Sequence, residues 1–369
     1  KAPFWSDCAY PISADVMEER LRDEVPSANS NGTRKLIACR RSNDSPIGSA
    51  EIRTIEGRVS DLTFCVPEVF GPLRRSEVTA EMIRLLVPWL IHEHDRMVVW
   101  VNAGASDMLV RSAALGVGMH QAFVLREAYT ARGGKREDQI GYQALHPAWL
   151  SSLGAPTSPV FGNVAREVRS PAPGDYPERE KDPPTNAFLV GNRIYLKPIE
   201  EADAIAIAKW AMRETETAFD VGRTARSPIS YWHWTRKNYE ADPATWVRFA
   251  ICLLDDDTVI GSNGLAFIDW IHRTAETETD IVQPEYRGGG FGTEAKHLLL
   301  EYAFETLGLH MVRSQAWAFN TPSCAALRKQ GYRDAGRLNW TGIKNGVFAD
   351  DLVFDLLAQE WREQRTNQA

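Results

Sequence analysis

The sequence has few cysteines, and their spacing matches no common disulfide or zinc motif. Five occur in 369 residues, Cys8, Cys39, Cys65, Cys252 and Cys324, and no two of them form a Cys-x-x-Cys pair. An odd number without such pairs argues against a disulfide framework and against a cysteine zinc site. We therefore expect reduced thiols and no bound metal.

Long apolar runs and an excess of positive charge are also absent. No stretch approaches the ~20 apolar residues of a membrane-spanning helix, and Lys1–Trp5 lacks the apolar core of a signal peptide. The 42 Lys and Arg residues against 49 Asp and Glu give a formal net charge of −7, which disfavours a general nucleic-acid surface. These features predict a cytoplasmic protein that binds neither nucleic acid nor membrane.

The length of the chain predicts two domains. Hydrophobic residues make up 44% of the sequence, enough to bury sizeable cores. Between residues 151 and 185 the composition shifts to Pro, Gly and Ser, which is typical of a linker. We therefore expect one domain over residues 1–150 and another over residues 186–369.

A glycine-rich turn is the most informative stretch of the second half. It follows the strand-like segment Asp280–Gln283 and precedes residues 296–304, whose apolar positions recur at helical spacing. A glycine-rich turn that opens a helix can hold a phosphate, because backbone N–H groups and the helix dipole both point at it. Glycines also let the backbone approach a pyrophosphate closely.

The glycine pattern fits neither a P-loop nor a Rossmann fingerprint. It does fit Arg-x-x-Gly-x-Gly, filled by Arg287, Gly290 and Gly292. This resembles the acyl-CoA pyrophosphate loop of the GNAT N-acetyltransferase superfamily. Residues 188–361 resemble the branch of that family with the ribosomal-protein alanine acetyltransferases, on ordered motifs at residues 189–198, 201–203, 260–262, 307–310, 320–323 and 331–332.

The first half repeats parts of the second. Lys35–Cys39, a polar turn and Ile47–Ile52 match a hairpin about 213 positions later, at Phe249–Cys252 and Ile260–Ser262. The resemblance therefore implies an α/β (α+β) protein of two tandem GNAT folds, each a mixed, mostly antiparallel sheet flanked by helices. Where the second copy has its glycine loop, the first has Gly71 followed by Pro72, which removes an N–H donor. We expect this copy to be degenerate and not to bind CoA, and to pack against the second domain or shape its acceptor cleft.

The resemblance implies acetyl-CoA or another acyl-CoA as cofactor. Strand backbone at Ile281 and Val282 would face the pantetheine, and Asn320 would bond it or cap a helix. The N–H groups of the loop would hold the pyrophosphate, at Arg287, Gly288, Gly289, Gly290, Phe291, Gly292 and Thr293.

Transfer to an amine needs a group that accepts its proton. Glu276, Glu278 and Asp280 share one face of a predicted strand because side chains alternate with period two. Crowded, partly desolvated carboxylates have raised pKa values. We predict Glu276 or Glu278 as the base and Asp280 as a partner of the substrate ammonium, with His272 as an alternative base.

The resemblance implies a further group beside the leaving thiolate. Leu327 stands where many members of the superfamily have a tyrosine, whereas Ser323 matches the serine of the alanine-acetyltransferase branch. The glutamate that acts as base in some of that branch would fall near Gly342, so that role does not transfer. Trp232 and Trp234 lie where the second helix of the fold covers the acceptor pocket, and at least one is expected to line it.

These observations predict an acyl-CoA-dependent N-acyltransferase that acts on a primary amine of a small molecule or natural product. Protein N-terminal acetylation and a non-catalytic acyl-CoA sensor are the alternatives. Aminoacyl-tRNA-dependent transferases of the Fem type also have tandem GNAT-like folds, but the retained loop and the acidic charge disfavour them. The sequence leaves open the acceptor, the acyl length and the oligomeric state.

Overall fold

A computed structural model gives the structure of the chain, and its described residues are 33–55, 59–130, 134–153, 182, 184–213, 227–239, 242–344 and 347–366. The chain divides into two compact units. Unit 1 is Lys1–Pro159 with Gly336–Gly342, and unit 2 is Val160–Ala335 with Ile343–Ala369. Most of the predicted linker lies outside the described residues.

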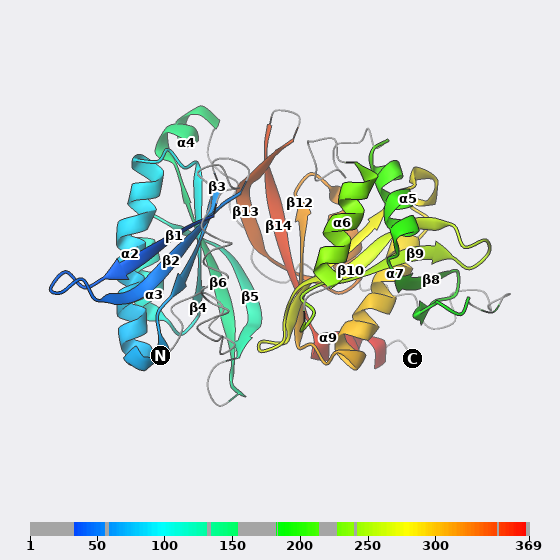
Figure 1. Ribbon diagram of the computed structural model, residues 1–369, viewed down its shortest axis with the longest axis horizontal. Coiled ribbons are helices and arrows are strands. Elements are labelled where there is room, and N and C mark those ends of the chain that lie inside the picture. The colour runs from blue at the N-terminus through cyan, green and yellow to red at the C-terminus, as the bar shows by residue number, and fades with distance from the viewer. Residues whose placement is uncertain are drawn as a thin grey trace. The chain divides into compact units, whose positions relative to one another are not determined.

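Unit 1 is a sheet flanked by helices (Figure 1). Its strands follow the order β1-β2-β3-β4-β6-β5, and only the β3–β4 pair is parallel. The elements are β1 (Thr33–Cys39), β2 (Pro46–Ile55), β3 (Val59–Cys65), η1 (Glu68–Phe70), α2 (Gly71–His92), β4 (Val98–Gly104), α3 (Met108–Gly116), β5 (His120–Thr130), β6 (Arg136–Leu145) and α4 (Pro147–Leu153).

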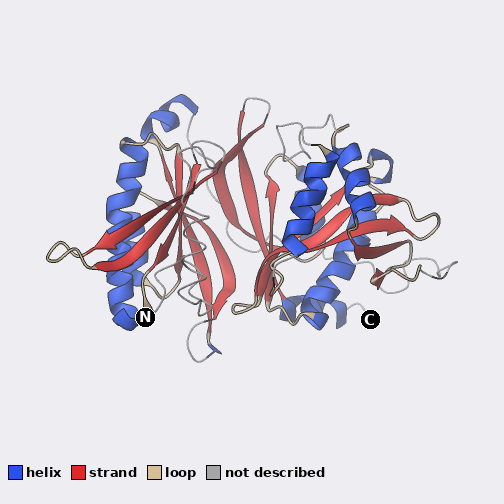
Figure 2. Cartoon of the chain, in the orientation of Figure 1, coloured by secondary structure: helices blue, strands red, loops and turns tan. Residues whose placement is uncertain are grey.

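Unit 2 also combines a sheet with helices (Figure 2). The β11–β12 pair is parallel, and the other pairs along β12-β11-β10-β9-β8-β7 and between β12 and β14 are antiparallel. The elements are β7 (Leu189–Val190), β8 (Ile194–Pro198), α5 (Glu201–Ala211), α6 (Pro228–Tyr239), β9 (Val247–Leu253), β10 (Val259–Asp269), β11 (Thr274–Ile281), η3 (Pro284–Tyr286), α7 (Phe291–Glu301), η4 (Tyr302–Thr306), β12 (Met311–Trp317), α8 (Thr321–Lys329), the two ends of β13 (Arg333–Lys344), β14 (Val347–Leu357) and α9 (Ala358–Thr366).

The predicted fold class is confirmed as a mixed α/β protein with mostly antiparallel strands. In both units an antiparallel hairpin leads to a strand, a helix and a second strand parallel to the first. The repeated hairpin is β1–β2 in unit 1 and β9–β10 in unit 2. That unit 1 is itself a degenerate GNAT fold stays a prediction.

Residues 336–342 of β13 belong to unit 1, which the predicted boundaries do not include. Gly336 pairs there with Phe123 of β5. A Cβ at position 336 would come within 2.3 Å of the Ala122 carbonyl oxygen, so this approach requires glycine. The buried side chain of Gln143 donates to the Asn339 carbonyl (2.8 Å) and accepts from its N–H (3.0 Å). A strand that comes late in the sequence therefore completes the edge of the first unit.

The helical spacing predicted after the glycine turn is confirmed in α7 and in η4, which follows it directly. Ala295, Leu299, Leu300 and Ala303 recur at intervals of three and four and are buried in the main core of unit 2. Within the described residues, no helix is long and apolar enough to span a bilayer. The same residues form no cluster of His, Cys, Asp and Glu that could hold a metal ion.

Candidate active site

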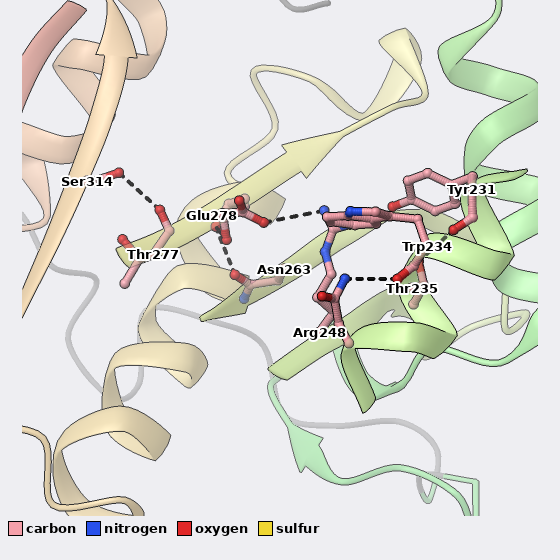
Figure 3. Close-up of polar contacts among 10 residues, drawn as sticks. Tyr231, Trp234, Thr235, Arg248, Asn263, Thr277, Glu278 and Ser314 are labelled. Atoms are coloured by element: carbon pink, nitrogen blue, oxygen red, sulfur yellow. Dashed lines mark hydrogen bonds and ion pairs between the residues drawn. The ribbon is translucent and has the colours of Figure 1, made fainter. Parts of the chain in front are cut away.

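The two parallel strands of unit 2, β11 and β12, pair over their first three residues and then separate to form a fork. Their pairing runs from Thr274 with Met311 to Glu276 with Arg313. Just beyond, the Ser314 hydroxyl donates to the Thr277 carbonyl at 3.1 Å (Figure 3). Beyond Glu276, the described strand pairing of β11 continues with β10 and no longer with β12.

The glycine loop follows the fork strand and opens α7. Gly288 and Gly290 have φ values of +76° and +82°, in the left-handed region that favours glycine. Among the described residues, the N–H groups of residues 288–293 donate no hydrogen bond to another group. A Cβ on Gly292 would meet only ordinary contacts, at 3.5 Å or more. Because packing within the protein does not require glycine there, close approach of a ligand is a better reason for it.

The loop is fastened by a buried ion pair that the sequence did not reveal. The Glu294 carboxylate, only 4% exposed, accepts from the N–H groups of Asn192 (2.8 Å) and Arg193 (2.9 Å). Its second oxygen accepts from Arg193 Nε (2.9 Å), and Arg193 Nη1 donates to the Gly289 carbonyl (2.8 Å). A Cβ at Gly191 would lie 2.5 Å from Glu294 Oε1, so a larger residue there would displace this carboxylate.

These features fit the pyrophosphate of a CoA thioester. A rigid loop whose unengaged N–H groups point from a helix N-terminus is a ready anion site. Unit 1 has no such loop, because α2 begins at Gly71 directly after η1. In unit 2 four residues, Arg287–Gly290, separate η3 from α7. The loop is thus present in unit 2 and missing in unit 1.

The two faces of the fork strand have different surroundings. Asn263 of β10 donates to the Ala295 carbonyl of α7 at 2.6 Å and accepts from the Thr279 hydroxyl at 2.9 Å. Thr279 therefore faces α7. Because side chains alternate, Glu278 faces the opposite side, where α6 lies.

The two candidate bases are held differently. Glu276 forms an ion pair with Arg313 of β12, with 3.1 Å between Oε2 and Nε. Glu278 faces Arg248 of β9 at 3.4 Å, and its Oε2 is enclosed without a hydrogen bond from any described residue. Burial raises the pKa of Glu278 and the charge of Glu276 adds to this, while Arg248 and Lys296 oppose it. Glu278 is therefore the better candidate for a base near neutral pH.

Lys296 is a buried cation of α7 that sequence reasoning missed. The residue is 4% exposed, and its amine forms neither a hydrogen bond nor an ion pair with the described residues. Burial lowers the pKa of Lys296 to about 7, although the carboxylates of Glu278 and Glu276 act in the opposite direction. The one sequence signal for this residue is that a lysine stands at a position of α7 where the helical periodicity predicts an apolar side chain.

Lys296→Met is expected to stabilise the protein, and more strongly at pH 6 than at pH 9. The pKa of Lys296 lies below the ordinary 10.5. The cost of burying the charge is therefore fully present below pH 7 and fades as the pH rises towards 10. We expect a gain of roughly 3 kcal/mol at pH 6, measured by urea unfolding. Lys209→Met, at an exposed position of α5, should leave the stability at both pH values unchanged.

The predicted pantetheine contacts are engaged within the protein. Arg287 Nε donates to the Ile281 carbonyl at 2.8 Å, and the Val282 N–H donates to the Ile260 carbonyl at 3.0 Å. A carbonyl oxygen has two lone pairs, so Ile281 can accept a second bond. The backbone role of Ile281 and Val282 stays a prediction.

The serine and asparagine predicted near the leaving group belong to α8. Asn320 is its N-cap and accepts from the Ser323 N–H at 3.3 Å. The hydroxyl of Ser323, which is half-buried, bonds no described residue. Leu327 is buried in the core, so it offers no polar group. No described hydrogen bond joins α8 to Glu278, and the role of Ser323 stays a prediction.

The remaining predicted residues separate into core and surface. Trp232 packs against the small core between α5 and β9, whereas Trp234 is 39% exposed. The guanidinium of Arg248 lies 4.9 Å from the Trp234 ring, so Trp234 is the tryptophan near Glu278 (Figure 3). Asp280 is exposed at the far end of β11, and His272 lies in the turn before this strand.

Comparison with known proteins agrees with this geometry. Residues 193–333 match the family described as Acetyltransferase (GNAT) domain. An uncharacterized N-acetyltransferase p20 from Bacillus licheniformis is 32% identical over 114 residues, which is 31% of this chain and 64% of the relative. A putative ribosomal N-acetyltransferase, YdaF from Bacillus subtilis, is 32% identical over 31% of this chain and 61% of the relative. The match thus spans less than two thirds of these relatives.

A crystal structure of spermidine N-acetyltransferase from Vibrio cholerae, in complex with CoA and spermine, is also similar. It is 22% identical, with a TM-score of 0.43, over 47% of this chain and 99% of that one. The matched family covers the strands of the fork, the glycine loop and α7. Residues 193–333 therefore resemble a GNAT acetyltransferase domain.

Proposed function

We propose that the protein is an acyl-CoA-dependent N-acyltransferase, with acetyl-CoA as donor and the primary amine of a small molecule as acceptor. The observation that carries the proposal is the loop of residues 288–293, whose N–H groups donate no hydrogen bond among the described residues. It follows a strand fork that carries Glu278, whose Oε2 accepts no hydrogen bond from a described residue. The loop binds the donor, and the carboxylate serves the acceptor. The active site lies in unit 2.

Each residue has a distinct role in this reaction. Acetyl-CoA supplies an acyl thioester. Glu278, when ionised, accepts the proton that the amine loses on attack, directly or through water. Arg248 holds the carboxylate in place and opposes the rise of its pKa. Ser323 is proposed to donate to the sulfur, since its hydroxyl bonds no described residue.

Unit 1 is proposed to be a copy that no longer binds the donor. Its β3–β4 pair and α2 have the same order as the fork strands and α7. The four residues that form the loop in unit 2 have no counterpart, and Pro72 offers no N–H at the start of α2. One acetyl-CoA per chain is therefore expected.

The names of two relatives favour different acceptors. Spermidine N(1)-acetyltransferase from Escherichia coli is 31% identical over 88 residues, 24% of this chain and 47% of the relative, and suggests a small amine. The name of YdaF, a putative ribosomal N-acetyltransferase, points to a ribosomal acceptor, and we keep protein N-terminal acetylation as the second candidate function.

Thiol release from acetyl-CoA, followed with a chromogenic disulfide, separates these functions. The protein should release thiol with small primary amines, and mass spectrometry should show an acetyl group on the amine. Peptides with free N-terminal Ala or Ser should react at least tenfold more slowly. Faster reaction with peptides would favour N-terminal acetylation, and binding without release for any acceptor would identify a sensor.

A further inference from the structure

A row of aromatic rings lies on the α6 side of unit 2. Trp234, Trp246 and Phe267 pack edge to face, with ring centroids 5.3 Å and 4.9 Å apart. Trp234 is 39% exposed and Phe267 is 50% exposed. They come from α6, the segment before β9 and the end of β10, so three separate elements build one aromatic surface. We call these three residues the ring row.

The ring row is held by the backbone of the strand beneath it. Phe267 has φ +50°, unusual for a residue with a side chain, at a bulge where the β10–β11 register shifts. The Ile268 N–H donates to the Thr245 carbonyl at 2.9 Å, and Trp270 Nε1 donates to the Ala244 carbonyl at 2.8 Å. Left-handed backbone at such a residue costs free energy and is concentrated at binding sites. The surface is therefore fixed before a ligand arrives.

Arg248 connects the ring row to Glu278. Its guanidinium carbon lies 4.9 Å from the Trp234 centroid, and its Nη2 is 3.4 Å from Glu278 Oε2. The side chain crosses β10 at Gly264, where a Cβ would lie 3.1 Å from Arg248 Cγ and 2.4 Å from the Val247 carbonyl oxygen. Trp234, through Arg248, and the Glu278 carboxylate thus lie on one face of β9, β10 and β11 (Figure 3).

The charges along this face favour a ligand with one amine group over a ligand with several. A ligand amine at Glu278 meets a carboxylate, but a second ammonium towards the rings would meet the guanidinium of Arg248. Glu276 is paired with Arg313, and Asp280 lies beyond Glu278 on the side away from Phe267. Flat apolar groups gain contact with exposed aromatic rings.

We propose that the acceptor is a monoamine with a flat apolar or aromatic body that packs on Trp234, Trp246 and Phe267 while its amine faces Glu278. This inference rests on the proposed function and names its substrate class. Transfer forms a bond from the amine nitrogen to the acyl carbon and breaks the bond from that carbon to sulfur. The amine proton leaves through Glu278, and the thiol of CoA is released.

The test compares tryptamine, n-butylamine and spermidine in the thiol-release assay with acetyl-CoA. We expect kcat/KM for tryptamine to be at least tenfold above that for n-butylamine or spermidine. Trp234→Ala should raise KM for tryptamine at least tenfold and lower the ratio of kcat/KM for tryptamine to kcat/KM for n-butylamine at least fivefold. Trp234→Phe should keep most of the tryptamine preference.

Phe188→Ala is the matched control, because Phe188 is 51% exposed but stacks on Phe249, whose side chain points to the opposite face from Arg248. This variant should leave kcat/KM for all three amines unchanged. A preference for spermidine, or an equal loss with all amines in Trp234→Ala, would overturn the inference and leave the proposed function standing. No thiol release with any amine or peptide would remove the proposed function and this inference with it.

Discussion

Gly290→Pro is expected to abolish the acetyl-CoA binding that calorimetry should detect in the native protein. Proline fixes φ near −65°, whereas Gly290 has φ +82°, so the loop cannot keep its path. The substitution also removes the N–H of the residue that caps α7. A loss of affinity of at least 10²-fold is expected, because several N–H donors to the pyrophosphate are displaced together.

Two variants separate this effect from general strain. Gly290→Ala keeps the N–H, but its Cβ would lie 3.3 Å from Arg193 Nη2 at an unfavourable φ, so a smaller loss of affinity is expected. Gly71→Ala places the same strain at the start of α2, φ +72° with open space around it, and should leave affinity unchanged. Circular dichroism and the melting temperature show that each variant is folded. Unchanged affinity in folded Gly290→Pro would refute the assignment of the loop.

Glu278→Gln is expected to lower kcat by ~10²–10⁴-fold with acetyl-CoA affinity retained. The amide keeps the shape of the side chain but cannot accept the proton. Because burial raises the pKa of Glu278, kcat/KM of the native enzyme should fall on the acid side at a pH above the ordinary range of glutamate. The rate falls as the pH falls, since only the ionised carboxylate is active.

The neighbouring groups provide controls for this prediction. Glu276→Gln should lower kcat less than Glu278→Gln does, because the Glu276 carboxylate is already paired with Arg313. Arg248→Met removes the largest of the charges that lower the Glu278 pKa, so the acid limb should move to higher pH. Equal losses in Glu276→Gln and Glu278→Gln, or an acid limb unmoved by Arg248→Met, would contradict the assignment of Glu278.

The local features of the site could be predicted from the sequence. The strand, glycine turn and helix appear as β11, Arg287–Gly290 and α7, because each depends on neighbouring residues alone. The alternation in β11 also holds, with Ala275 and Thr277 buried between more exposed carboxylates. Short-range pattern was sufficient for these elements.

Contacts between distant residues could not be predicted. The Glu294–Arg193 pair joins residues 101 apart, and the Arg248–Glu278 pair depends on the register of three strands and on Gly264. The bulge at Phe267 could not be predicted, because a phenylalanine and not a glycine or asparagine occupies the position with positive φ. Nor could the sequence distinguish Trp234 from Trp232, because their environments are set by the elements that α6 meets.

The central claim is that the loop of unit 2, and not the start of α2 in unit 1, holds the phosphates of the donor. Hydrogen–deuterium exchange with and without CoA tests it most directly, since the N–H groups of residues 288–293 are unengaged and should exchange fast in the free protein. Added CoA should slow exchange in peptides that cover residues 281–296 and leave residues 66–79 unchanged. Protection at residues 66–79, or none at residues 288–293, would contradict the account.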